Sequence, residues 1–66
     1  MNTTEKGKVK FFNEEKGFGF IIQQGTGKEI FVHKSETREY LQENDEVQFV
    51  VARGEKGPFA SQVEVI

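Results

Sequence analysis

The segment Lys16-Gly-Phe-Gly-Phe-Ile-Ile22 alternates two glycines with two phenylalanines directly after a lysine, a pattern that predicts a β-strand. Because successive side chains of a strand point to opposite faces of the sheet, Phe18 and Phe20 share one face. Gly19 and Ile21 share the other. A glycine inside a strand indicates that another backbone approaches closely or that the strand bends at a barrel corner. The segment therefore predicts a strand with aromatic rings on one face and little bulk on the other.

Four further segments show strand patterns, and turn residues separate them. The five predicted strands are residues 8–13, 18–23, 29–33, 46–53 and 59–66. Segment 35–43 contains good helix formers and a candidate cap at Ser35, but Tyr40 and Leu41 alone cannot form a continuous apolar stripe. We therefore predict a loop with a short helical turn there, within an all-β barrel or sandwich.

Alternation also divides the third strand, with Phe31 and His33 on one face and aliphatic residues on the other. Branched aliphatic residues are expected inside a small barrel. The predicted inner set is Val9, Ile21, Ile30, Val32, Val47, Phe49, Val51 and Val63. The alternative is a sheet covered on both faces, with Phe18, Phe20 and Phe31 in a second core layer. A 66-residue chain without a full helix leaves nothing to cover that face, so we expect the rings to be exposed and to bind a ligand.

Composition excludes several classes of site. The 66 residues include no cysteine and one histidine, so neither a disulfide nor a thiolate or multi-histidine metal site can form. No apolar run approaches the roughly 18 residues that span a bilayer, and residues 1–6 lack the apolar core of a signal peptide. We expect one domain over residues 1–66, a cytoplasmic monomer without membrane association, metal or cofactor.

Charge is distributed unevenly, although the net charge is only −2. Residues 1–34 contain six lysines and four glutamates, whereas residues 35–66 contain three basic and seven acidic residues. Lysines among aromatic residues favour a nucleic-acid ligand, because bases stack on rings and ammonium groups follow phosphates. Stacking requires unpaired bases, which indicates a single strand. The plain alternative is a solvated lysine-rich face.

Several motifs together closely resemble the bacterial cold shock proteins over most of the chain. The matching segments are Lys16-Gly-Phe-Gly-Phe-Ile21 and Ile30-Phe-Val-His33, which resemble the two RNA-binding motifs of the family, together with Gly7-Lys-Val-Lys-Phe-Phe-Asn13 and Gly57-Pro58 followed by Ala60 and Val63. The resemblance implies a five-stranded antiparallel OB-fold barrel with a short helical turn between strands 3 and 4. It also implies binding of single-stranded RNA and single-stranded DNA with low sequence selectivity, as an RNA chaperone. Such a chaperone needs no ATP, because binding to unpaired segments shifts the pairing equilibrium toward the open strand by mass action.

The resemblance further implies which residues contact nucleic acid. Seven positions match the family's binding positions as they stand, namely Lys10, Phe12, Lys16, Phe18, Phe20, Phe31 and His33. Phe11 stands where the family usually has tryptophan, Lys34 replaces an aromatic residue, and Phe59 replaces a polar one. Phe12 can turn inward because it follows Phe11 directly, and Phe59 can pack at an edge or join the site. Both of these assignments stay open.

Three other functional classes fit parts of the sequence. Lys-Gly-Phe-Gly-Phe also begins an RRM motif, but Gln23 stands where that motif ends in an aromatic residue, and two packing helices are missing. His33 and Ser35 lack a third orienting group, and Glu14-Glu15 belongs to a solvated turn, so no catalytic residues are expected. A protein-interaction barrel is the second candidate, because an aromatic strip can also receive a peptide.

Overall fold

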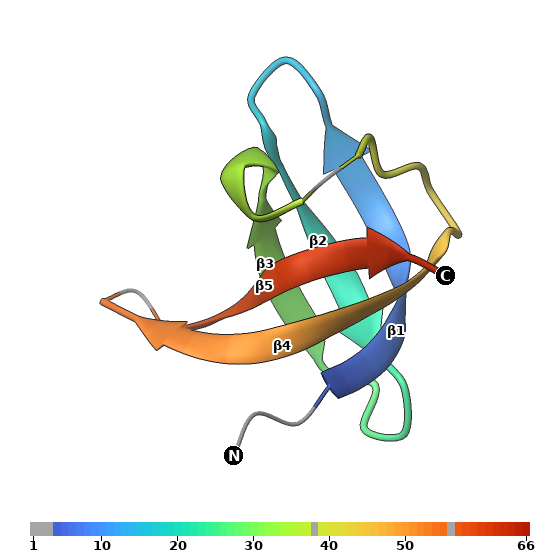
Figure 1. Ribbon diagram of the computed structural model, residues 1–66, viewed down its shortest axis with the longest axis vertical. Helices are drawn as coiled ribbons and strands as arrows, with labels where there is room; N and C mark the ends of the chain where they lie inside the picture. Colours follow the sequence, from blue (N-terminus) through green and yellow to red (C-terminus); the bar gives the residue numbers. More distant parts are fainter. Residues whose placement is uncertain (1–3, 38, 56) are drawn as a thin grey trace.

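The computed structural model describes residues 4–37, 39–55 and 57–66, and in this part of the chain five strands form a closed barrel (Figure 1). The elements in chain order are β1 (Thr4–Asn13), β2 (Phe18–Gln23), β3 (Glu29–His33), the 3-10 turn η1 (Lys34–Glu36), β4 (Glu46–Gly54) and β5 (Gly57–Val65). The strand order around the barrel is β1-β2-β3-β5-β4. The all-β, five-stranded OB-type barrel and the helical turn after the third strand are therefore confirmed.

Four of the five strand contacts are antiparallel, and the fifth is parallel. β3 and β5 run in the same direction where Phe31 pairs with Phe59, and this short contact closes the barrel. β1 is longer than predicted because its first residues, from Thr4 to Lys8, pair with β4. No local pattern reveals such a long-range contact. Because β1 pairs with β2 and with β4, it joins the two halves of the barrel.

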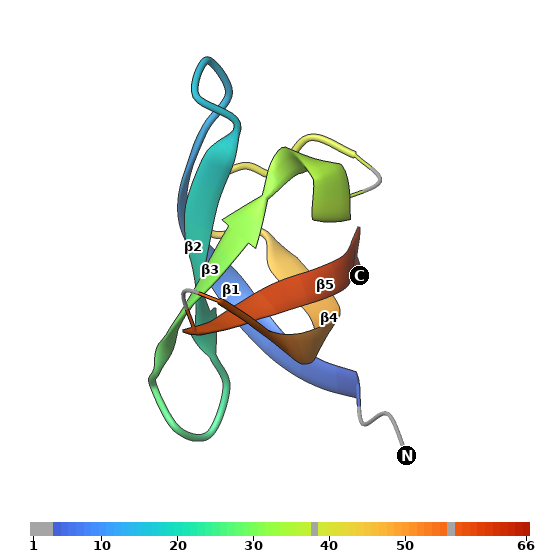
Figure 2. The ribbon, with the colours of Figure 1, turned by 90° about the vertical axis from the view of Figure 1, so that its left-hand side faces the viewer.

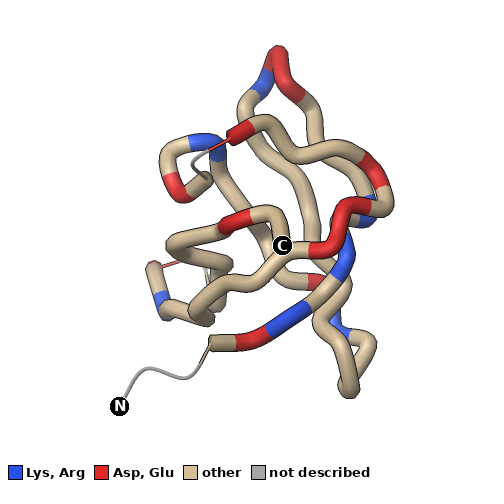
Figure 3. The backbone as a smooth tube through the Cα atoms, turned by 45° about the vertical axis from the view of Figure 1, so that its right-hand side comes forward, with Lys and Arg blue, Asp and Glu red and all other residues tan. Residues whose placement is uncertain are grey.

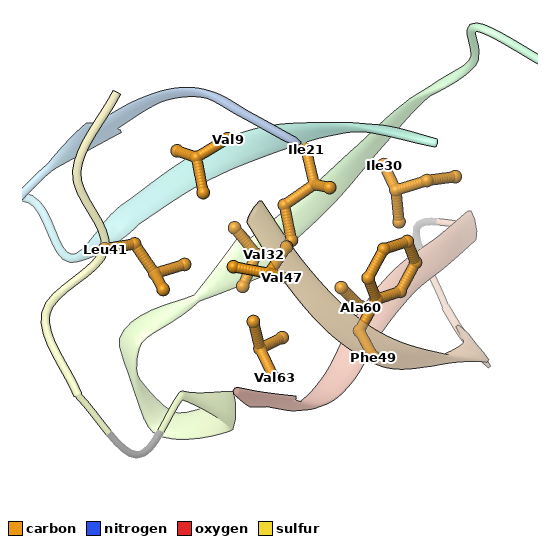
Figure 4. Packing of buried hydrophobic residues seen from close by; sticks show 9 residues of the cluster. All are labelled: Val9, Ile21, Ile30, Val32, Leu41, Val47, Phe49, Ala60 and Val63. Carbon is orange, nitrogen blue, oxygen red and sulfur yellow. The ribbon is translucent and has the colours of Figure 1, made fainter. Parts of the chain in front are cut away.

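The barrel interior holds a single cluster of mostly aliphatic side chains (Figure 4). The buried hydrophobic residues of the described chain are Val9, Ile21, Ile30, Val32, Leu41, Val47, Phe49, Ala60 and Val63. Seven of them belong to the predicted inner set. The prediction was wrong for Val51, which is half-buried and packs against the cluster from its edge. Alternation also missed Ala60 and Leu41.

Leu41 enters the core from a loop rather than from a strand. Figure 4 shows the Leu41 side chain pointing into the core from the loop before β4. Leu41 is 2% exposed, whereas its neighbour Tyr40 is 76% exposed. Two backbone hydrogen bonds hold the end of this loop to β1. The Val9 N–H donates to the Asp45 carbonyl oxygen at 2.9 Å, and the Asn44 N–H donates to the Val9 carbonyl oxygen at 2.8 Å. The loop therefore closes the barrel end with an apolar side chain.

Replacement of Leu41 by alanine is expected to lower the free energy of unfolding by about 2–5 kcal/mol, because it leaves a cavity at the barrel end. The adjacent Tyr40→Ala variant is the control, and its change should stay within about 0.5 kcal/mol since that ring is exposed. Chemical denaturation of both variants measures the difference. Equal effects of the two substitutions would contradict the core position of Leu41.

Candidate nucleic-acid interface

Four phenylalanine rings gather on the outer face of β1, β2 and β3, which lie side by side in one wall of the barrel (Figure 2). They are Phe11, Phe18, Phe20 and Phe31, and we call them the aromatic cluster. Each ring contacts two others in a closed cycle, with centroid separations of 6.4, 6.0, 5.9 and 5.6 Å. Phe11 and Phe31 are 38% and 37% exposed, and the other two rings are half-buried. The rings therefore lie outside the core, as alternation predicts for Phe18, Phe20 and Phe31.

A β-bulge at Lys10 turns Phe11 outward. Val9 pairs with Ile21 of β2, and two positions later Phe11 pairs with Phe20. β1 therefore contains one extra residue at this point. Without it, alternation from the buried Val9 would point Phe11 into the barrel. The bulge thus brings a ring from β1 into the aromatic cluster and leaves Lys10 exposed beside it.

Phe12 faces inward as a consequence of the same bulge. Its side chain is half-buried and packs against the core cluster. It also lines a hollow together with Lys34 and Tyr40, so part of the ring remains accessible. The structure places Phe12 mainly in a packing role, at the border of the outer face.

Gly19 allows β1 and β2 to meet closely on the inner side of the aromatic cluster. A Cβ at this position would lie 2.3 Å from the Phe11 carbonyl oxygen and 2.8 Å from the Phe12 Cα. Close approach of another backbone is therefore confirmed as the reason for a glycine between Phe18 and Phe20. Any larger residue would push the β1 segment that carries Phe11 away from β2.

His33 continues the outer face at the end of β3. It pairs with Phe18 of β2, and its side chain is exposed. The ring Nδ1 accepts a hydrogen bond from the Ser35 N–H at 3.2 Å and lies 3.0 Å from the Ser35 Oγ. A nitrogen that accepts a hydrogen bond carries no proton, so the proton of the neutral ring is on Nε2. These contacts cap η1 and fix the imidazole at the edge of the aromatic cluster.

The three candidate phosphate-binding lysines have different surroundings. Lys16 is exposed in the turn between β1 and β2. The side chain of Lys34 packs over Gly17, as shown by the Lys34 Cδ, which would lie only 2.8 Å from a Cβ added to Gly17. Lys10 forms an ion pair with Glu29, and among the described lysines it alone is held in such a pair. Figure 3 marks the lysine positions along β1 and the acidic positions near the C-terminal end of the chain.

Phe59 lies on β5 beside the aromatic cluster without joining its ring contacts. It pairs with Phe31 across the parallel contact, so the two side chains leave the sheet on the same side. The ring of Phe59 turns toward the β4–β5 hairpin, where a Cβ at Gly54 would lie 3.1 Å from its Cε1. This arrangement gives Phe59 an edge-packing contact on Gly54 and leaves it adjacent to the candidate interface.

Sequence reasoning missed two residues of this surface, Glu29 and Gly17. Each touches a lysine from a different element of the chain, so no spacing rule could connect them. The bulge did have a local signal. Strict alternation up to Lys10 is followed by two consecutive phenylalanines, and such a break is typical of one inserted residue in a strand.

Residues 4–37, 39–55 and 57–66 contain no helix that is long and apolar enough to cross a membrane. The same residues contain no group of three or more histidine, aspartate or glutamate side chains placed to hold a metal ion.

Residues 5–66 match the family model of the 'Cold-shock' DNA-binding domain. The chain belongs to the cold shock domain family. This result confirms the resemblance seen in the motifs, and the family is a nucleic-acid-binding one whose members are in general not enzymes. The chain therefore belongs with proteins that bind nucleic acid.

Individual relatives agree with this assignment. Cold shock-like protein CspA of Bordetella pertussis is 46% identical over 66 residues, which cover 94% of this chain and 98% of the relative. Cold shock protein CspV of Vibrio cholerae is 48% identical over 67 residues, which cover 96% of each chain. Among solved structures, Drosophila Unr CSD456 has a TM-score of 0.80 at 27% sequence identity. That match covers 97% of this chain and 27% of the Drosophila chain.

Replacement of Gly19 by alanine is expected to lower the free energy of unfolding by about 1–3 kcal/mol, because the new methyl group meets backbone atoms of β1 that cannot move independently. Gly54→Ala is the matched control. Its methyl group would crowd only the movable ring of Phe59 and would lie at an ordinary contact distance of 3.8 Å from the Gly57 carbonyl oxygen, so the change should stay within about 1 kcal/mol of either sign. Denaturation midpoints of both variants give the comparison, and a harmless Gly19→Ala substitution would refute the close approach.

Proposed function

We propose that this protein is a cytoplasmic monomer that binds single-stranded RNA and single-stranded DNA with little sequence selectivity and acts as an ATP-independent RNA chaperone. The observation that carries the proposal is the aromatic cluster on the outer face of β1, β2 and β3. Lys10, Lys16 and Lys34 stand at its borders, with His33 and Phe59 as outer neighbours. Phe12 contributes only the part of its ring that remains accessible.

The ring geometry favours a flexible strand as the ligand. Neighbouring rings of the cluster are tilted against each other by angles from 21° to 77°. A ligand that stacks on several of them must present its bases at different angles. An unpaired strand can rotate each base separately, whereas a duplex keeps its base faces parallel and covered.

Stacking also accounts for the proposed low selectivity. Every base has a π-face, so a ring accepts any of them, and each stacked base contributes about 1–3 kcal/mol. Lysine contacts to phosphates carry no sequence information. The proposed site therefore distinguishes unpaired from paired segments more strongly than one sequence from another.

Preferential binding of unpaired segments is sufficient for chaperone activity. At a free protein concentration of about 100 times Kd, each bound protein stabilises the open strand by about 2.7 kcal/mol. This equals about two base-pair steps, at about 1.4 kcal/mol per step. The protein should therefore open weak hairpins and leave long duplexes paired. Hairpins that end transcription or cover translation start sites are the proposed targets, through antitermination or translation regulation.

A hairpin-opening assay tests the proposal directly. An RNA hairpin of marginal stability carries a dye and a quencher at its ends, and addition of the protein without ATP should raise the fluorescence. A hairpin with a long GC stem should stay closed, and an unstructured labelled strand should bind with an affinity that falls as salt is raised. If the unstructured strand does not bind even at low salt, the proposal fails and a protein partner becomes the better candidate for the aromatic cluster.

Replacement of Phe31 by alanine is expected to weaken binding of an unstructured strand by about 1–3 kcal/mol with little loss of stability, since the ring is exposed and lies outside the core. Ile66→Ala is the control, because Ile66 is an exposed apolar residue outside the cluster. Titration of a dye-labelled strand and chemical denaturation measure the two quantities. A loss of several kcal/mol in stability with unchanged binding would assign Phe31 a structural role.

A further inference from the structure

The ion pair between Lys10 and Glu29 lies across the outer face, directly beside the aromatic cluster. Lys10 is the bulge residue that precedes Phe11, and Glu29 is the first residue of β3. β2 lies between these two strands, so the pair reaches over it. The two side chains are 54% and 48% exposed, so a ligand can reach both of them.

The strand registers place Glu29 in the row of outward positions next to the cluster, and Lys10 is the unpaired bulge residue that precedes Phe11 of the first row. In one row Phe20 of β2 pairs with Phe11 and with Phe31. In the next outward row Ile22 of β2 pairs with Lys8 and with Glu29. A bound nucleic-acid strand that extends beyond the first row of rings toward Glu29 therefore meets a carboxylate as well as an ammonium group.

A phosphate and the Glu29 carboxylate compete for the same ammonium group. If a phosphate takes Lys10, Glu29 loses its partner and stays close to a second negative charge. Like charges at such short range repel, and the repulsion offsets the attraction that Lys10 supplies. A solvated ion pair is also weak, so the ligand can break it easily but gains little by doing so.

We propose that Glu29 is a built-in competitor of the ligand phosphate at Lys10 and thereby limits the affinity of the interface for single strands. The inference rests on the proposed function, because it concerns the same surface. Glu29 then determines how much of the binding comes from charge. With Lys10 neutralised, the first row of rings supplies most of the affinity, and the bound strand is released more readily.

A double-mutant cycle with Glu29→Gln and Lys10→Gln tests this inference. The probe is dye-labelled oligothymidylate, which forms no base pairs with itself, titrated at several salt concentrations. Glu29→Gln should bind about two to five times more tightly at low salt, the range expected for release of one exposed ion pair. Its salt dependence should become steeper by about 0.7 in logarithmic slope, as expected for one added phosphate contact. Lys10→Gln should weaken binding by a larger factor in the Glu29→Gln variant, where the ammonium group is free for a phosphate, than in the unmodified protein, where Glu29 already holds it.

Glu15→Gln is the matched control for a general effect of charge. Glu15 is exposed in the turn between β1 and β2 and has no ion-pair partner among the described residues. Any gain from Glu15→Gln should be smaller and should persist after Lys10→Gln. If Lys10→Gln weakens binding by the same factor with and without the Glu29 carboxylate, the inference is overturned.

The two proposals fail in distinguishable ways. Absence of any binding by the unmodified protein overturns the proposed function. Binding that depends on Phe31 but is unaffected by Glu29→Gln overturns only the competition at Lys10. Circular dichroism of each variant verifies that the barrel is folded in every titration.

Discussion

The small interior of the barrel is the constraint on which the other features depend. The described core contains a single aromatic side chain, Phe49, among otherwise aliphatic residues. Five strands closed around so narrow a space leave no second layer in which other rings could be buried. Alternation then places the remaining rings of β2 and β3 on the outside, and the bulge in β1 adds Phe11 to them. The exposed aromatic face is thus a consequence of how the barrel closes.

Contacts among the exposed rings make this face an organised surface. Edge-to-face and stacked ring pairs at such separations are the arrangements that aromatic side chains prefer. The closed cycle of four contacts holds each ring between two others. A ligand therefore meets rings that are already ordered, so less conformational entropy is lost on binding. The absence of a side chain at Gly19 also helps to fix the rings, because it lets the backbone of β1, which carries Phe11, lie close against β2.

Much of this structure could be predicted from the sequence, and the missed parts share one physical cause. Period-two patterns in segments 18–23 and 29–33 are local, so those strands and the direction of their rings were predictable. Leu41 was not, because a single apolar residue in a loop has no periodicity and becomes buried only when the loop crosses the barrel end. The parallel contact of β3 with β5 and the Lys10–Glu29 pair likewise depend on segments far apart in the chain. Local pattern indicated which face carries the rings, and only tertiary structure revealed which charges border them.

The borders of the aromatic cluster bear on how a chaperone would distinguish unpaired from paired strands. Phosphates are present in both, so lysine contacts add affinity for a duplex and for a single strand alike. Only stacking on the rings requires unpaired bases. A ligand shifts an equilibrium only through its difference in affinity for the two states. The chain has a net charge of −2, and Glu29 holds Lys10. Both features keep the electrostatic attraction to phosphates small for duplexes and single strands alike. In the proposed function, the difference in affinity between open and paired strands therefore comes from stacking on the rings, and the electrostatic attraction sets only how tightly both are bound.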